Sequence, residues 1–249
     1  MTHAPIKQAF ILGAGLGTRM RPLTATKPKP LVPLAGKPLI DHVIERLKQV
    51  GVERFIVNVH YCGDQLEAHL KQHDNCTIII SDERETLLDT GGGLRKAIDH
   101  LERAPFFIHN SDSVWLEDKS AQQSNLTRMV ERFDEHAMQS LLLLADKDTA
   151  LGYDGKGDFF MEEEGTLKRR PSNETSNFVF TGVSIASASL LKAASKEPAG
   201  IPFSLNKLWD QGLSAQRVYG IEHKGRWMHV GTPEALKQAE DCIKDYEMS

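Results

Sequence analysis

The sequence predicts an α/β protein with a mostly parallel, mixed sheet flanked by helices. Strand-like and helix-like segments alternate along the chain, and a glycine-rich loop directly follows the first predicted strand. The composition is that of an ordinary globular chain, with 40% hydrophobic and 26% charged residues. At 249 residues the chain can bury a sizeable core, so we expect a single domain.

The predicted strands are short apolar runs between turn residues. We expect them at residues 10–12, 55–59, 77–80, 106–108, 141–144 and 178–185. Residues 158–168 predict a hairpin that turns at Glu164 and Gly165. The predicted helices lie at residues 39–47, 65–72, 93–101, 126–136, 203–209 and 233–246. Gly51 ends the first of them, and Thr232 and Pro233 supply the N-cap and first position of the last.

Charge is distributed unevenly along the chain, whose formal net charge is −4. Residues 1–40 contain no Asp or Glu, but they contain the basic residues Lys7, Arg19, Arg21, Lys27, Lys29 and Lys37. A local cationic stretch in an otherwise acidic protein favours a site for a small polyanion and gives no reason to expect a nucleic acid partner.

Neither membrane insertion nor a disulfide framework is expected. The apolar runs are too short to cross a bilayer, and the first residues lack the core and cleavage site of a signal peptide, so we expect a cytoplasmic protein. Cys62, Cys76 and Cys242 are scattered without a C-x-x-C pair, which indicates reduced thiols. His69 and His73 lie four residues apart on a predicted helix and could bind a metal, although an exposed polar face is the favoured interpretation.

The loop at residues 13–19 reads Gly-Ala-Gly-Leu-Gly-Thr-Arg, and its glycines would let backbone N–H groups approach phosphate oxygens. A dinucleotide-binding fold would need a helix directly afterwards, but Pro22, Pro28, Pro30 and Pro33 prevent one. No Gly-Lys-Ser or Gly-Lys-Thr completes a P-loop. The prolines instead predict an extended cationic arm that holds Lys29 at a phosphate-sized site.

Several separated motifs resemble those of the sugar-1-phosphate nucleotidyltransferases. They are the glycine loop with Arg19 and Pro22-Leu23-Thr24, then Pro28-Lys29-Pro30-Leu31, Asp89-Thr90-Gly91-Gly92-Gly93, Asn110-Ser111-Asp112, Thr181-Gly182, and Trp227-Met228-His229-Val230-Gly231-Thr232. The resemblance covers nearly the whole chain. It implies a glycosyltransferase-A-like, Rossmann-like fold, with a nucleotide-binding part at about residues 1–145, a sugar-binding hairpin region at about 146–232 and a C-terminal helix at 233–249.

The resemblance also implies roles for individual residues. Arg19, Lys29 and Asp112 are expected to be catalytic, and Asp112 is expected to hold Mg²⁺, with Mn²⁺ or Co²⁺ as alternatives. The expected nucleotide-binding residues are Leu12, Gly13, Ala14, Gly15, Gly17, Thr18, Asp89, Gly91, Gly92 and Asn110. Gly91 and Gly92 correspond to a base-reading loop, although a helix-entry turn would also explain them. The expected sugar-binding residues are Glu162, Arg169, Asn177 and Gly182.

Within the family, the resemblance extends to uridylyltransferases of bacterial cell-wall recycling that act on N-acetylmuramate 1-phosphate and UTP. The lactyl carboxylate of that sugar needs a cation, which Arg169, Arg170 or Lys224 could supply. Mannose 1-phosphate with GTP and glucose 1-phosphate with UTP or dTTP remain alternative substrates. Many family members have Asp as the second metal ligand where this chain has His229, which keeps open an inactive nucleotide-sugar sensor.

Overall fold

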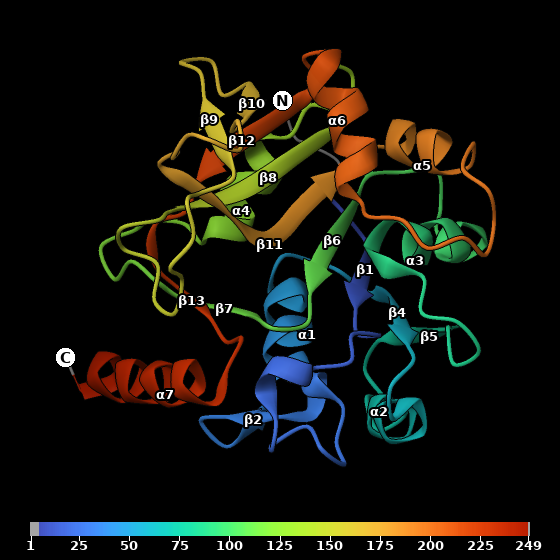
Figure 1. The fold of residues 1–249 in the computed structure, drawn as a ribbon, viewed down its shortest axis with the longest axis vertical. Coiled ribbons are helices and arrows are strands. Elements are labelled where there is room, and N and C mark those ends of the chain that lie inside the picture. The colour runs from blue at the N-terminus through green and yellow to red at the C-terminus, as the bar shows by residue number, and fades with distance from the viewer. Residues whose placement is uncertain (1–4, 249) are drawn as a thin grey trace.

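A nine-stranded mixed sheet forms the centre of the computed structural model, which describes residues 5–248 (Figure 1). Its main path runs β10-β9-β11-β6-β1-β4-β5, and β8 pairs with both β11 and β12. The strands are β1 (Gln8–Leu12), β4 (Arg54–Val59), β5 (Thr77–Asp82), β6 (Phe106–Asn110), β8 (Ser140–Asp146), β9 (Phe159–Met161), β10 (Leu167–Arg169), β11 (Phe178–Ala186) and β12 (Val218–Glu222). The strands from β6 to β5 are parallel, so their carboxyl ends meet at one edge.

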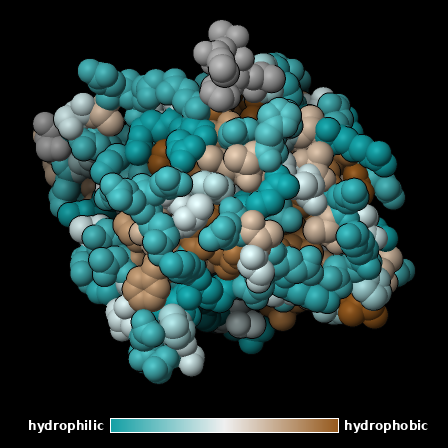
Figure 2. Space-filling view, turned by 90° about the horizontal axis from the view of Figure 1, so that it is seen from above, coloured by the Kyte–Doolittle hydropathy of each residue, from teal (hydrophilic) through white to brown (hydrophobic). Residues whose placement is uncertain are grey.

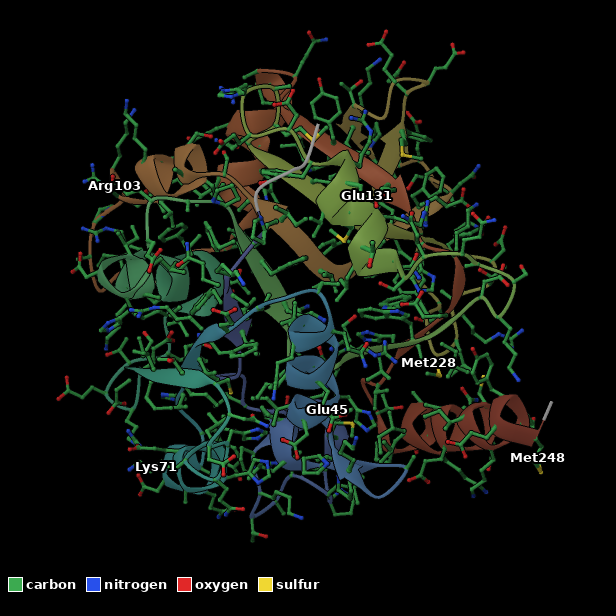
Figure 3. The ribbon with its side chains drawn as sticks, turned by 180° about the vertical axis from the view of Figure 1, so that it is seen from behind. Glu45, Lys71, Arg103, Glu131, Met228 and Met248 are labelled. Carbon is green, nitrogen blue, oxygen red and sulfur yellow. The ribbon has the colours of Figure 1, made fainter. Side chains whose placement is uncertain are left out.

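Successive strand residues point to opposite sides of the sheet, so both faces carry apolar side chains. Helices cover both faces and form two cores. One core contains Ala9 and Ile11 with the apolar faces of α1 (Leu39–Gln49), α2 (Gly63–Leu70) and α4 (Asn125–Arg132). The other contains Phe10 with those of α3 (Asp89–Ala97), α5 (Ala188–Ala194) and α6 (Asn206–Ser214). Figure 3, drawn from behind, brings α1 and α4 to the front, where Glu45 and Glu131 mark them.

A smaller antiparallel pair, β7 (Ser113–Glu117) with β13 (Gly225–His229), extends from the end of β6 toward the C-terminal helix α7 (Pro233–Met248). Trp227 anchors this pair to the main sheet, since its indole N–H lies 3.1 Å from the carbonyl oxygen of Thr181. A third core joins α7, β13 and the hairpin of β2 (Pro33–Leu34) and β3 (Lys37–Pro38). Through this pairing β13, a late segment of the chain, lies beside β7 near the carboxyl ends of the parallel strands.

The structure confirms every predicted strand and the hairpin at residues 158–168, and it shifts several helices. α3 begins at Asp89, before the predicted 93, so the three glycines lie inside its first turns. α4 ends at Arg132 and α6 runs from Asn206, so both predicted ranges were misplaced. The predicted N-cap of α7 is confirmed, because Thr232 Oγ1 accepts a hydrogen bond from the Ala235 amide at 3.2 Å. Ser249, the last residue of the predicted C-terminal part, lies outside the described residues.

The surface seen from above is mostly hydrophilic, and the apolar side chains on it are scattered (Figure 2). Large exposed hydrophobic residues among the described part of the chain include Leu16, in the glycine loop, and Leu23, on the arm that follows it. None of the helices between residues 5 and 248 combines the length and the apolar character that a membrane span requires.

Candidate active site

The glycine loop follows β1, and a buried amide holds its backbone in place. Asn58, on the neighbouring strand β4, accepts hydrogen bonds from the amides of Gly13 at 2.7 Å and Ala14 at 3.3 Å. Its own amide nitrogen donates to the fully buried Glu83 at 2.7 Å. Burial raises the pKa of Glu83, while the hydrogen bonds from Asn58 and from the Leu88 amide oppose that shift. The hydrogen bonds that connect Glu83, Asn58 and the loop therefore fix the positions of the Gly13 and Ala14 amides.

The cationic arm folds back against the same loop. Gly17 has a left-handed backbone, with φ of 62°, and a Cβ there would lie 3.1 Å from both Lys29 Cβ and Thr24 Cγ2. The Thr24 hydroxyl donates to the Gly17 carbonyl oxygen at 2.7 Å. Short 3-10 turns at Thr18–Met20 and Lys29–Leu31, with Met20 and Pro30 buried, fix the rest of the arm. The arm thereby brings Lys29 back beside the loop.

Lys29 and Asp112 form an ion pair at the carboxyl end of the parallel strands. Lys29 Nζ lies 2.5 Å from Asp112 Oδ2, and the two side chains are 12% and 21% exposed. Burial alone would raise the pKa of Asp112, but the charge and hydrogen bond of Lys29 outweigh it and hold that pKa below its ordinary value. The carboxyl group of Asp112 is therefore ionised near neutral pH.

His229 ends β13 and is paired in register with Ser113, the residue after Asp112. A Cβ on Gly231 would lie 2.7 Å from His229 Nε2 and 3.5 Å from Arg19 Nη1, so the imidazole and the guanidinium lie on the same side of this turn. Burial lowers the pKa of His229, the negative charge of Asp112 opposes that shift, and the charges of Lys29 and Arg19 add to it. His229 is therefore a neutral imidazole beside an ionised carboxylate.

Two adjoining cavities open at this edge of the sheet. The first, of about 310 Å³, is lined by Leu12 at the end of β1, by loop residues 13–15, by Lys29 and Asp112, and by Asn58 and Glu83. The second, of about 260 Å³, is lined by Asp158, Arg169, Phe180 and Trp209. Both are bordered by the same four residues, Leu12, Asp89, Thr90 and Asn110. The arrangement offers a phosphate-binding cavity next to a more aromatic one that holds a guanidinium.

Most of the predicted site residues come together here. Leu12, Gly13, Ala14, Gly15, Lys29, Asp89, Asn110 and Asp112 line the first cavity, and Arg169 lines the second. Gly17 packs beneath the arm, and Thr18 and Arg19 lie exposed on the turn that follows it. Many of these residues stand in motifs at the ends of β1 and β6, where chain topology brings side chains together, whereas Lys29 lies on the arm and Asp89 begins α3.

Gly91 and Gly92 have a packing reason for their small size. Both amides donate to the carbonyl oxygen of Phe203, at 2.9 and 3.0 Å. A Cβ on Gly91 would collide with the Phe203 ring, and one on Gly92 would lie 2.9 Å from the Ile201 carbonyl oxygen. Neither glycine lines the two cavities, so the structure supports the helix-entry alternative and the base-reading role stays a prediction.

The structure places three of the expected sugar-binding residues outside both cavities. Glu162 pairs with Lys168 at 2.7 Å, and Asn177 is exposed. Gly182, at φ of 90°, accommodates a side chain of the protein, because a Cβ there would lie 2.9 Å from Asn110 Nδ2. Gly182 thus affects the cavities through Asn110.

Sequence reasoning missed Asn58, Glu83 and Asp158. Asn58 is the one polar side chain in the otherwise apolar stretch 55–59, and that interruption was the available signal. Asp158 Oδ2 accepts a hydrogen bond from the Phe180 amide at 2.9 Å in the wall of the second cavity. Neither Glu83 nor Asp158 stands in a motif that would identify it.

Asp112 and His229 have the chemistry to hold a divalent ion. An ionised carboxylate and a neutral imidazole both offer lone pairs, and the burial and charges described above produce these protonation states. This donor set carries one negative charge instead of the two that a pair of Asp ligands would provide. It would therefore suit a divalent metal ion, with less selectivity for Mg²⁺ than two carboxylates would have.

Comparisons with known proteins agree with this geometry. The nucleotidyl transferase family model matches residues 8–245. The chain is 41% identical to N-acetylmuramate alpha-1-phosphate uridylyltransferase of Caulobacter vibrioides, over 96% of this chain and 98% of that protein. It is 32% identical to the enzyme of the same name in Neisseria meningitidis, over 94% and 96%. Mannose-1-phosphate guanylyltransferase 1 of Arabidopsis thaliana is 31% identical, over 91% of this chain and 62% of its own length.

Solved structures show the same fold at low identity. UDP-glucose pyrophosphorylase complexed with UDP-glucose has a TM-score of 0.78 and 18% identity, covering 97% of this chain and 99% of that one. The inositol-1-phosphate CTP transferase of T. maritima has a TM-score of 0.78 and 17% identity, covering 98% of each. The expected glycosyltransferase-A-like fold is confirmed.

Proposed function

The chain belongs to the nucleotidyl transferase family, and from that premise we propose that it transfers UMP from UTP to N-acetylmuramate 1-phosphate. The products are pyrophosphate and a UDP-sugar, which would serve the recycling of cell-wall precursors in the cytoplasm. The observation that carries the proposal is the position of the Lys29–Asp112 pair in a cavity that adjoins a second one containing Arg169. The 41% identity to a uridylyltransferase of that specificity supports the choice of substrate.

The reaction requires positioning and charge neutralisation. An oxygen of the sugar phosphate attacks the α-phosphorus of UTP, a new P–O bond forms, and the bond from that phosphorus to the β-phosphate bridging oxygen breaks. The nucleophile is already anionic, so no protein base has to remove a proton. Lys29 would hold the sugar phosphate in line, and the amides of Gly15 to Gly17, which follow the two that Asn58 holds, would bind UTP phosphates. Arg19, exposed beside His229, would stabilise the departing pyrophosphate.

Asp112 and His229 are the residues that would hold the metal ion. A bound divalent cation would neutralise phosphate charge during the displacement. We propose Mg²⁺ as the usual ion and expect Mn²⁺ or Co²⁺ to support activity as well, because imidazole is a better ligand for these ions than for Mg²⁺.

Arg169 is the best-placed cation for the lactyl carboxylate. It lines the second cavity, where its Nε donates to Asp210 at 2.6 Å and its Nη2 lies 3.2 Å from Asn206 Oδ1. Arg170 is occupied with the carbonyl oxygens of Gly157, Pro171 and Glu174. Lys224 pairs with Glu222 at 3.1 Å at the end of β12 and lines neither cavity.

Arg169→Met should therefore change sugar preference. We expect the kcat/KM for N-acetylmuramate 1-phosphate to fall about ten- to hundredfold, the contribution of one charge-assisted hydrogen bond, with little change for N-acetylglucosamine 1-phosphate. The matched control is Lys168→Met, which removes an exposed cation from the same strand. A parallel loss with both sugars would assign Arg169 a structural role through Asp210 instead.

The proposed function is tested by incubating the purified protein with UTP, Mg²⁺ and a panel of sugar 1-phosphates, and measuring pyrophosphate. The highest rate is expected with N-acetylmuramate 1-phosphate. Faster turnover of mannose 1-phosphate with GTP, or of glucose 1-phosphate with UTP or dTTP, would establish the alternative hexose-1-phosphate reaction. The absence of pyrophosphate with every sugar and every divalent ion would support the nucleotide-sugar sensor.

A further inference from the structure

Two histidines and an aspartate converge on one point outside the active site. His69 Nε2 lies 2.7 Å from Asp41 Oδ1, and His73 Nε2 lies 3.2 Å from the same oxygen. One ligand atom from each of the three residues lies within 4.8 Å of the others. The two imidazole rings are 5.7 Å apart between centroids and nearly perpendicular, so both present Nε2 to the same carboxylate.

The cluster joins two helices. Asp41 lies in the first turn of α1, His69 lies in the last turn of α2, and His73 follows shortly after that helix ends. In Figure 3, Glu45 marks α1 and Lys71 marks the end of α2. The side chains of Asp41, His69 and His73 are 15%, 22% and 19% exposed. The three side chains are therefore largely covered by other residues, but water can still reach them.

We propose that Asp41, His69 and His73 bind a divalent transition-metal ion of the zinc class. Two imidazole nitrogens and one carboxylate oxygen form a donor set that zinc prefers, with water as a fourth ligand. Mg²⁺ is disfavoured because it takes oxygen ligands in octahedral geometry. Zinc–nitrogen bonds of about 2.0–2.1 Å would separate the donors by roughly 3.3 Å. The distances from Asp41 Oδ1, now 2.7 and 3.2 Å, lie close to that value, and the two Nε2 atoms, which lie within 4.8 Å of each other, would take up the same spacing. The ion replaces the imidazole protons that now face Asp41, and each neutral ring then carries its proton on Nδ1.

This ion would connect α1 with α2, the two helices that support the cationic arm. The Tyr61 hydroxyl, just before α2, lies 2.9 Å from the Thr24 carbonyl oxygen and 2.8 Å from that of Ala25. Gln65, in α2, donates to the Thr26 carbonyl oxygen at 2.9 Å. α1 directly follows the β2–β3 hairpin in which the arm ends. The proposed role of the metal is thus structural, and it does not depend on which sugar the active site accepts.

The test measures Co²⁺ and Zn²⁺ binding to protein stripped of metal with a chelator. Asp112→Asn serves as the background, so that the active-site carboxylate does not contribute. We expect one bound Co²⁺ with the visible absorption of a four- or five-coordinate ion, displaced by Zn²⁺. At a Zn²⁺ concentration a hundredfold above its Kd, the unfolding temperature should rise by about 5 to 10 °C.

His73→Gln, Asp41→Asn and the exposed-histidine control His136→Gln separate this site from any other. The two site variants should bind Zn²⁺ at least about tenfold more weakly, since even the partner of a ligand contributes about ten- to hundredfold, and they should lose the thermal shift. The control should keep both. His73 lies beyond the helix, which makes its substitution the gentler one for folding. No metal binding in the chelator-treated parent protein, or equal binding in all variants, would overturn the proposal.

Discussion

Lys29 pairs with Asp112 in the site, and the prediction at the residue scale concerns that pair. Lys29→Ala should lower kcat by about two to four powers of ten, because one positioned electrostatic group is removed from the transferring phosphates. Lys27→Ala is the matched control, since Lys27 is an exposed cation of the same arm. Steady-state pyrophosphate release measures both. Near-normal turnover of the Lys29 variant would remove this residue from the mechanism.

His229→Asp tests the second metal ligand. An added carboxylate beside Asp112 should lower the Mg²⁺ concentration needed for half-maximal activity by about tenfold and reduce any preference for Mn²⁺ or Co²⁺, since these ions are the ones that imidazole favours. Activity titrations with each metal, together with the unfolding temperature of the variant, provide the measurement. An unchanged metal requirement and an unchanged preference would place His229 outside the coordination sphere.

Sequence motifs located the residues at strand ends and on the arm better than the residues that act on the site through another side chain. Lys29 and Asp112 were predictable because each stands in a motif at a strand end or on a proline-braced arm, and the structure pairs them. Asn110 was predicted for the same reason, but its contact with Gly182 was not. Glu83 acts through Asn58, and this contact leaves no characteristic spacing in the sequence because it connects a residue of β4 with one that follows β5.

At the scale of the element, two glycines near the site should respond in opposite ways to alanine. A Cβ on Gly15 meets nothing within 4 Å, whereas one on Gly91 collides with Phe203 where α3 begins. Gly91→Ala should lower the free energy of unfolding by about 1 to 3 kcal/mol, as overpacking does. Gly15→Ala should leave that free energy nearly unchanged and weaken UTP binding, because it lines the first cavity. Chemical denaturation and calorimetric titration distinguish the two; equal stability of both variants would contradict the packing account.

Three of the strands that sequence reasoning did not find share a physical cause. β7, β12 and β13 are each five residues long, and in β13 only Trp227 and Met228 are apolar, between Arg226 and His229. Their pairing partners are distant in the chain, as in the register of Trp227 with Trp115. Period-two patterns are weak over so short a stretch, so long-range pairing decided these strands. β8 and β11 also pair with distant strands, but their apolar runs are longer and were predicted.

At the scale of the whole molecule, two buried histidines predict loss of stability in acid. Burial lowers the pKa of His109 to about 4 and that of His223 to about 3, against 6.5 for the ordinary side chain. The unfolded chain therefore takes up protons first as the pH falls below 6.5, and the folded state loses stability on the way to pH 4. Each histidine should contribute a slope of up to about 1.4 kcal/mol per pH unit.

His223→Phe isolates one of these contributions. The ring would still pack edge-on against Trp115, whose centroid lies 5.9 Å away, but it could no longer bind a proton. The acid slope of the free energy of unfolding should decrease by about one proton relative to the unaltered protein, while the exposed control His136→Gln should keep the full slope. Denaturant titrations at several pH values supply the slopes, and parallel curves for all three proteins would refute the assignment.

The order of strands in the sheet also determines which strand edges stay unpaired while the chain is being synthesised. β6 receives its second neighbour, β11, only after about seventy further residues have left the ribosome, which takes roughly 3 to 14 s at ordinary elongation rates. β8 likewise lacks both of its neighbours until β11 and β12 have been synthesised. During that interval the nascent chain carries the apolar strands β6 and β8 with unpaired backbone edges, which other chains can join. Aggregation at this stage requires two such chains to meet, so synthesis of fewer copies at once favours pairing of β6 and β8 with β11 over pairing with another chain.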